Sequence, residues 1–184
     1  MIKQFYFSEN RNYVQGSDII DHIFCTYDIN GAFRFKVLKP IYNNIVEISE
    51  EESSNTSAIF YDEKNKFYIN QISKDSNLRK IYKEDVFKKN LTFNKTTAIL
   101  KSFNKYSTTQ CMVTLFKLFL LSKYGAINKD GQWLFVYFEG ERSWGINYNE
   151  ILINLVYKKK YISKGGVEVN GVNVGFIYFN WGII

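Results

Sequence analysis

The sequence contains one histidine, two cysteines and no long apolar run, and each shortage excludes a class of protein. With one histidine and no CxxC or HxxxH spacing, we expect neither a zinc site nor any other metal or cofactor. The most continuous apolar run, LFKLFLL, is interrupted by Lys117 and is far shorter than the roughly 20 residues that cross a bilayer. The first ten residues have too few apolar side chains for a secretory signal. We therefore expect a soluble cytoplasmic protein without a membrane partner, in which Cys25 and Cys111 are buried free thiols.

Length and composition predict one folded domain, residues 1–184. The chain has 184 residues, of which 46% are hydrophobic and 18% aromatic, and this is enough apolar surface for a full core. The net charge of +6 would suit an anionic partner. However, lysine and asparagine are abundant throughout, together with Tyr, Phe and Ile, a pattern typical of low-GC codon usage. The charge by itself therefore predicts no function.

Most of the chain shows the period-two alternation of β-strands. In AFRFKVLK, Phe33, Phe35 and Val37 face one way and the charged residues face the other. Asn170-Gly171, between VEV and VNV, is the strongest hairpin signal, because both central residues of such a turn need positive φ. We expect eight or nine antiparallel strands, in segments 32–39, 44–51, 57–73, 96–103, 131–141, 149–163 and 166–181.

The longest predicted helix runs from Ser107 to Gly125. Ser107 can cap its start, and Gly125 can end it in the left-handed conformation. Between them, Gln110, Thr114 and Lys117 form one narrow polar stripe. A helix that is apolar around most of its circumference must be covered on most of it, so we expect this helix to be buried. Two shorter helices are predicted, in QGSDIIDHIF (15–24) and NLRKIYKEDVFKKN (77–90).

The fold class expected from this pattern is α+β, with a strongly twisted antiparallel sheet wrapped around the helix of residues 107–125. This layout resembles the hot-dog fold, in an elaborated or permuted version because four or five strands precede the helix. The resemblance implies a protein that acts on or binds an acyl thioester, such as a dehydratase, a thioesterase or an acyl-carrier-linked biosynthetic enzyme. It also implies acyl-CoA or an acyl carrier protein as partner.

The resemblance further implies roles for individual residues. Hot-dog enzymes commonly use a carboxylate, often with a histidine, so His22 with Asp18 or Asp21 would be the acid/base set. Backbone amides at the start of the long helix would polarise the thioester carbonyl. These amides belong to Ser107, Thr108, Thr109 and Gln110.

Asp18 and His22 also have a purely structural interpretation. With Ser17 as N-cap and Asp18 in the first turn, residues 17–24 form a capped amphipathic helix. Asp18 and His22 are four residues apart and lie on one helix face, so the carboxylate could raise the pKa of the imidazole and orient it as a general base. Alternatively, both side chains are simply solvated.

The segment from Glu139 to Glu150 is a second polar cluster. Its carboxylates, with Arg142 and Trp144, could line a substrate pocket in a loop held by rigid strands. Alternatively, the segment is a charged hairpin loop with Trp144 packed over its base. The sequence does not decide between these roles.

Two further segments suggest partners. The stretch YKKKYISKGG (157–166) interleaves tyrosines and lysines, as single-strand nucleic-acid binders do. On a strand, however, Lys158 and Lys160 would point away from Lys159, so nucleic-acid binding is not expected and the lysines would instead protect an edge strand. The apolar runs LFVYF and FIYFNW predict a homodimer, because one helix layer cannot cover them. They also support an alternative function, a non-enzymatic inhibitor, immunity or accessory protein that binds another protein through its aromatic-rich sheet.

Overall fold

The computed structural model describes residues 1–8, 11–29, 31–75, 77–101, 105–125, 131–142, 144 and 148–182. The chain divides into two compact units, residues 1–83 and 84–184, and each unit contains antiparallel strands and one α-helix. The single domain expected from the length stays a prediction. Residues 102–103 of a predicted strand, and Ser143 and 145–147 of the polar cluster, lie outside the described residues.

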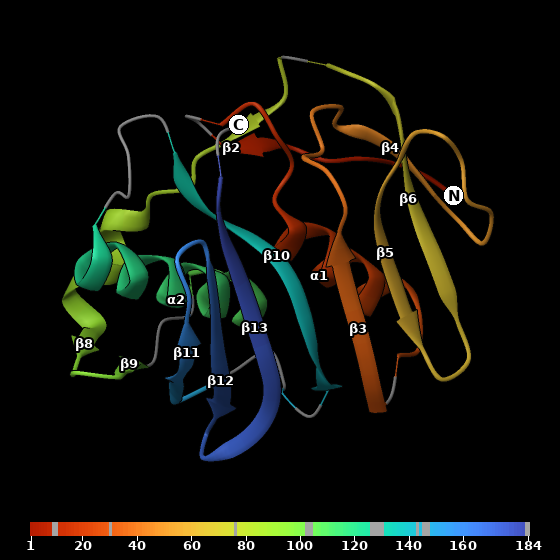
Figure 1. The fold of residues 1–184 in the computed structure, drawn as a ribbon. Coiled ribbons are helices and arrows are strands. Elements are labelled where there is room, and N and C mark those ends of the chain that lie inside the picture. The colour runs from red at the N-terminus through yellow and green to blue at the C-terminus, as the bar shows by residue number, and fades with distance from the viewer. Residues whose placement is uncertain are drawn as a thin grey trace. The chain divides into compact units, whose positions relative to one another are not determined.

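The first unit consists of one helix and seven strands among its described residues (Figure 1). Five strands form an antiparallel arrangement in the order β1-β4-β6-β5-β3, and β2 and β7 pair in parallel beside it. The elements are β1 (Ile2–Gln4), β2 (Phe7–Ser8), α1 (Gly16–Thr26), β3 (Gly31–Val37), β4 (Ile45–Ser49), β5 (Thr56–Asp62), β6 (Lys66–Ser73) and β7 (Arg79–Lys80).

Helix α1 supplies the core of this unit. Its apolar residues Ile19, Ile20 and Ile23 are fully buried. Near its end, the ring of Phe24 meets Phe33 of β3 edge-on at 5.0 Å between centroids, and Phe60 of β5 at 6.0 Å. An apolar stripe on one side of a helix and the inward residues of alternating strands bury one another, which is the main driving force for this packing.

The second unit has the same plan with a longer helix. Its sheet has the order β10-β13-β12-β11-β9-β8, and α2 contacts β9, β10 and β11. The elements are the 3₁₀ helix η1 (Glu84–Asn90), β8 (Leu91–Phe93), β9 (Thr97–Lys101), α2 (Thr108–Tyr124), β10 (Gln132–Arg142), β11 (Glu150–Lys158), β12 (Ile162–Val169) and β13 (Val172–Gly182).

The prediction for the long helix is confirmed. Ser107 is its N-cap, and Gly125 ends it with a φ of 61°. Leu115, Phe119 and Leu120 are fully buried. The predicted polar stripe makes a polar contact, because its residue Lys117 forms an ion pair of 2.9 Å with Glu84 of η1.

Phe116 of helix α2 packs tightly against the sheet where β12 has a glycine. A Cβ atom on Gly165 would lie 2.6 Å from Cγ2 of Ile153 and 3.0 Å from the ring of Phe116 on α2. The next residue, Gly166, points to the opposite face, where the nearest atoms would be 3.7 Å away. The helix can therefore lie flat on the sheet only because residue 165 has no side chain.

Several details differ from the sequence-based expectation. Of the helix predicted for 77–90, only Glu84–Asn90 is helical, and it is a 3₁₀ helix. Residues Arg79–Lys80 instead form β7, because their backbone pairs with β2. The described residues form thirteen strands rather than eight or nine, since the pattern could not reveal strands of two or three residues. Cys25 is exposed, although Cys111 is buried as expected, and both are free thiols.

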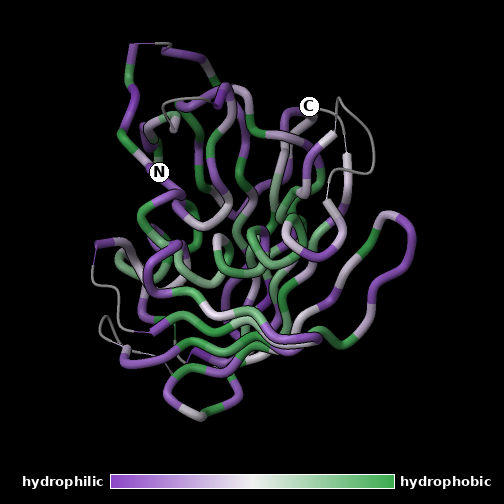
Figure 2. Tube along the Cα trace, turned by 90° about the vertical axis from the view of Figure 1, so that its left-hand side faces the viewer, coloured by the Kyte–Doolittle hydropathy of each residue, from purple (hydrophilic) through white to green (hydrophobic). Residues whose placement is uncertain are grey.

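The distribution of hydrophobic residues along the chain agrees with this arrangement of strands, helices and loops. In Figure 2 the hydrophilic residues gather in the connecting loops, and the hydrophobic residues concentrate in strands and helices. In the described part of the chain, no helix combines the length and the apolar character needed to span a membrane.

Candidate functional site

Helix α1 begins two residues before the position that the sequence suggested. Its N-cap is Gln15, not Ser17, and the cap makes no side-chain hydrogen bond to the helix. The Gln15 amide instead donates to the hydroxyl of Ser8 on β2. Ser17 lies inside the first turn, fully buried, and its hydroxyl has no hydrogen-bond partner among the described residues.

Asp18 is buried and forms an ion pair, so it is not the solvated carboxylate of the structural interpretation. The Lys80 ammonium donates to its Oδ2 at 2.6 Å, and the Asp18 side chain is only 7% exposed. The carboxylate also lies in the first turn of α1, where the helix dipole favours a negative charge. Asp18 is therefore paired with a lysine that is 62 residues away in the sequence.

Strand β7 is what brings Lys80 to this position. Its pairing with β2 places Arg79 opposite Phe7 and Lys80 opposite Ser8. The guanidinium of Arg79 then donates to the carbonyl oxygens of Ser8, at 3.3 Å, and Arg11, at 3.1 Å. These bonds fasten β7 to the segment that precedes α1.

His22 is half-buried on α1, and its contacts differ from those of Asp18. Its Nδ1 lies 3.4 Å from the hydroxyl of Thr26, one helical turn later, and its ring meets Phe5 edge-on at 5.7 Å. The Nε2 atom is buried and has no hydrogen-bond partner among the described residues. Burial, and then the positive charge of Lys3, lower the pKa of His22. The imidazole is therefore predominantly neutral at pH 7 and able to accept a proton.

That His22, Asp18 and Asp21 act as an acid/base set stays a prediction, but the structure shows which groups contact His22 and Asp18. The sequence suggested that Asp18 would raise the pKa of His22, whereas the structure lowers that pKa and pairs Asp18 with Lys80. The hydrogen-bonding group seen at the imidazole is the Thr26 hydroxyl. Asp21 is half-buried directly before His22.

At the start of α2 a complete capping box occupies two of the four predicted amides. The Gln110 amide donates to Oγ of Ser107 at 3.0 Å, and the Ser107 amide donates to Oε1 of Gln110 at 3.2 Å. Thr108 and Thr109 follow the cap and are buried. The predicted polarisation of a thioester carbonyl by the start of α2 stays a prediction.

The polar cluster between Glu139 and Glu150 is a crossover rather than a hairpin loop. It joins β10 to β11, and β13 and β12 lie between these two strands in the sheet. Trp144 stacks on the buried ring of Phe138 with 5.7 Å between centroids, as the structural interpretation proposed. Its predicted role in substrate binding stays a prediction.

Glu139 is the centre of a cluster that the sequence only partly indicated. Its carboxylate accepts hydrogen bonds from the hydroxyls of Tyr178, at 2.6 Å, and Tyr137, at 3.3 Å, and lies 3.7 Å from the ammonium of Lys164. The Lys164 ammonium is also 3.7 Å from the centroid of Phe176. Burial and the Glu139 carboxylate raise the pKa of Tyr178, so this phenol stays protonated and continues to donate.

This Glu139 cluster lies on the side of the sheet away from α2. Phe179 of β13 faces α2, where it meets Phe116 edge-on at 5.5 Å. Its sequence neighbour Tyr178 points the other way, because side chains alternate along a strand. Tyr178 is paired with both Tyr137 and Lys164, so all three share this outer face.

Comparison with known proteins identifies the fold. Neither a family model nor a curated protein sequence matches the chain. Among solved structures, it is similar to the dehydratase domain from the CurJ module of the curacin polyketide synthase, with 9% identity and a TM-score of 0.52, over 97% of this chain and 86% of that one. It is also similar to a monomeric dehydratase domain from a trans-AT polyketide synthase split module, with 9% identity and a TM-score of 0.50, over 100% and 99% of the two chains. The chain therefore has a hot-dog fold, as its sequence layout suggested.

Proposed function

We propose that this protein acts on or binds an acyl thioester, carried by coenzyme A or by an acyl carrier protein. The observation that carries the proposal is the match of nearly the whole chain to two polyketide synthase dehydratase domains. A shared fold at 9% identity does not transfer an activity, so the proposal depends on the residues of this chain. Dehydration and thioester hydrolysis are the two reactions to test first.

His22 is the residue that we assign to proton transfer. In a dehydration, a neutral imidazole can remove a proton from the carbon next to the thioester carbonyl and return it to the 3-hydroxyl group, which leaves as water. In a hydrolysis, it can remove a proton from the attacking water and return it to the sulfur of the departing thiol. Both need an imidazole that is unprotonated at neutral pH, and the lowered pKa of His22 meets this requirement.

Thr26 and Asp18 have separate roles in this proposal. Thr26 is a positioning residue, because its hydroxyl lies beside Nδ1 and can fix the tautomer and the ring orientation. Asp18 stabilises the start of α1 through Lys80. The start of α2, residues 107–110, is proposed independently as the part that polarises a thioester carbonyl, through the positive end of its helix dipole.

Turnover of acyl-CoA and 3-hydroxyacyl-CoA substrates tests the proposal. Enoyl thioester formation and free thiol release report dehydration and hydrolysis, respectively. The thiol assay should use a Cys25→Ser background, because Cys25 is an exposed free thiol that would react with the reagent. His22→Ala should reduce turnover about 10²–10⁴-fold, as expected for loss of an acid/base group, while the melting temperature changes little.

Two further variants separate positioning from stability. Thr26→Val keeps the shape of the side chain but removes its hydroxyl, so it should lower turnover and leave substrate binding intact. Asp18→Asn should lower stability more than turnover. Unchanged turnover in His22→Ala, or no binding of any acyl-CoA by calorimetry, would contradict the proposal.

A second candidate function is that of a non-enzymatic protein-binding factor. The outer face of β10, β13 and β12 supports it, because the rings of Tyr137, Phe176 and Tyr178 lie there and are only half-buried. The same face is the candidate interface for the predicted homodimer. Light scattering over a wide concentration range tests the dimer, and a mass that stays near 21.7 kDa would exclude it. A monomer without acyl-thioester turnover that co-purifies with one partner would favour this second function.

A further inference from the structure

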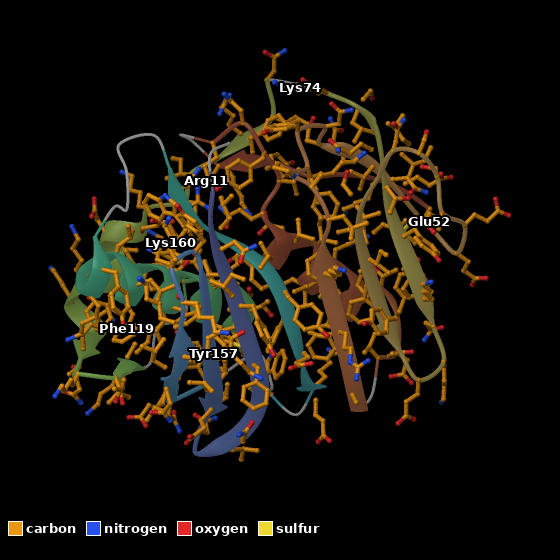
Figure 3. All side chains as sticks on the ribbon, in the orientation of Figure 1. Arg11, Glu52, Lys74, Phe119, Tyr157 and Lys160 are labelled. Atoms are coloured by element: carbon orange, nitrogen blue, oxygen red, sulfur yellow. The ribbon has the colours of Figure 1, made fainter. Side chains whose placement is uncertain are left out.

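The end of the β11–β12 hairpin has a different geometry from the continuous strand expected for the lysine-rich stretch. Strand β11 ends at Lys158, and β12 begins at Ile162. The amide of Lys159 donates to the carbonyl of Ile162 at 2.8 Å, and the reciprocal bond is 3.3 Å long. Lys159 and Lys160 are therefore in a tight turn, where strand alternation no longer separates them. Figure 3 labels Lys160 at this end of the hairpin.

This hairpin tip, defined here as residues 156–162 together with Tyr124 of α2, exposes large apolar side chains. Val156 is 53% exposed and Ile162 is 42% exposed. Three tyrosines accompany them, with exposed fractions of 39% for Tyr157, 45% for Tyr161 and 38% for Tyr124. Val156 and Ile162 lie on the face of the hairpin away from α2, and Tyr124 lies on the α2 side. The exposed apolar groups therefore surround the end of the hairpin, and such a concentration marks an interaction surface.

The lysines of the tip lie against these rings. The ammonium of Lys158 is 4.6 Å from the centroid of Tyr124, and that of Lys160 is 4.8 Å from the centroid of Tyr161. Lys159 between them is exposed. Residues 156–162 include three consecutive lysines and no acidic residue, so the tip combines aliphatic, aromatic and positively charged groups.

We propose that the hairpin tip binds the surface of a lipid bilayer that contains anionic lipids. Tyrosine rings are favoured at the headgroup level, and Val156 and Ile162 can enter the boundary of the acyl chains. Lysine side chains can rest along apolar groups and place their ammonium groups at lipid phosphates. This partner differs from the expectation from sequence, which included no membrane partner, and it does not depend on the proposed thioester chemistry.

The side-chain arrangement favours a bilayer over single-stranded nucleic acid. Bases bind such proteins by stacking on the faces of aromatic rings. At this tip, lysines already lie over Tyr124 and Tyr161, and a stacked base would have to displace them from that face. A nucleic acid would also leave Val156 and Ile162 exposed to water, whereas a bilayer would cover them.

Co-sedimentation with vesicles tests the proposal on the full chain. Vesicles of phosphatidylcholine alone are compared with vesicles that also contain phosphatidylserine. The wild type should bind the anionic vesicles, and replacing Lys158, Lys159 and Lys160 by Gln should weaken binding about fivefold per lysine, or on the order of a hundredfold in total. Val156→Ser with Ile162→Ser should weaken binding even when the lysines are retained.

A matched control variant removes three positive charges from a part of the chain outside the hairpin tip. Lys36, Lys64 and Lys66 are three exposed lysines of the first unit, and replacing all three by Gln lowers the net charge equally. This control should bind anionic vesicles nearly as well as the wild type. Circular dichroism of each variant checks that it is folded.

Several outcomes would overturn the proposal. One is a wild type that stays in the supernatant with anionic vesicles at low salt. Another is an equal loss of binding in both triple variants, which would indicate a net-charge effect without a specific site. Tip-dependent binding of a fluorescent single-stranded oligonucleotide without vesicle binding would identify a nucleic-acid site instead. A dimer that dissociates on Val156→Ser with Ile162→Ser would identify the tip as a subunit interface.

Discussion

Replacing Gly165 by alanine should destabilise the protein, whereas replacing the adjacent Gly166 should stabilise it. The difference tests how closely α2 packs on its sheet. Gly165 and Gly166 are consecutive in β12, and neither has a positive φ, so a methyl group strains neither backbone. At Gly165 the new Cβ would lie 2.6 Å from Cγ2 of Ile153 and 3.0 Å from the ring of Phe116. At Gly166 it would meet only ordinary van der Waals contacts, at 3.7 Å and beyond.

The expected magnitudes follow from these distances. Overpacking a well-filled core by one methyl group costs about 1–3 kcal/mol, so Gly165→Ala should lower the free energy of unfolding by that amount. Gly166→Ala should raise it by about 0.4–1 kcal/mol, because alanine has less conformational freedom than glycine in the unfolded chain. For a chain of this size, each kcal/mol shifts the melting temperature by about 2–4 °C. The two variants should therefore differ by about 3–16 °C.

Thermal melts followed by circular dichroism measure this difference. A double variant adds a specific control, because Ile153→Ala removes the atom nearest to the new methyl group. Its cost should be smaller in the Gly165→Ala background than in the wild type, since the two sites are in contact. If Gly165→Ala melts at or above the temperature of Gly166→Ala, then α2 does not lie on the sheet at this distance and the packing argument is wrong.

Three further predictions concern the first turns of the helices and the single histidine. Lys80→Met and Asp18→Asn should each cost about 1.5–3 kcal/mol in urea unfolding, and the double variant should cost less than the sum, because each single change leaves a partner without its charge-assisted hydrogen bond. Additive costs would exclude the pair. The pKa of His22 is lowered in the folded protein, so its stabilising effect is complete above about pH 6.5 and decreases as the pH falls below that value. The urea midpoint should fall less steeply with acidification in His22→Gln, and parallel curves for both proteins would contradict this. Ser107→Ala should cost about 1 kcal/mol by removing the cap of α2, and a loss below a few tenths would argue against the capping box.

The sequence predicted those features that depend on local chemistry. The apolar circumference of α2, with Ser107 before it and Gly125 after it, defined both the bounds of the helix and its burial. Asn170 and Gly171 defined the last hairpin, and their φ values of 53° and 78° are those that the turn requires. In each case, a few neighbouring residues determine the backbone conformation without help from distant parts of the chain.

Register further along the same hairpin could not be predicted. Counting outward from the turn, Val169 pairs with Val172, and the same count would place Lys164 opposite Ile177. The structure has a bulge between Val167 and Glu168, so Lys164 instead lies opposite Tyr178. One additional residue on a strand changes every later partner, and the sequence has no clear signal for it. For this reason, the sequence pattern indicated Glu139 as a candidate residue but did not predict its neighbours, which are Tyr137, Tyr178 and Lys164.

The candidate site on α1 shows a second kind of limit. Its residues were named from the sequence, but the partner of Asp18 is Lys80, which lies on a strand of only two residues. Such a strand has no periodicity, and its neighbours were expected to be helical. The partial burial that lowers the pKa of His22 likewise comes from the packing around α1, which a single segment of sequence does not encode.

All three tryptophans of the chain, at positions 133, 144 and 181, belong to the second compact unit. Two of them, Trp133 and Trp181, are nearly perpendicular ring neighbours with centroids 5.4 Å apart. Intrinsic tryptophan fluorescence therefore reports on residues 84–184, whereas far-ultraviolet circular dichroism reports on both units. A single unlabelled sample can thus reveal whether the halves of the chain unfold together. Coincident transitions would indicate one cooperative body, and a fluorescence change at a different urea concentration would indicate two.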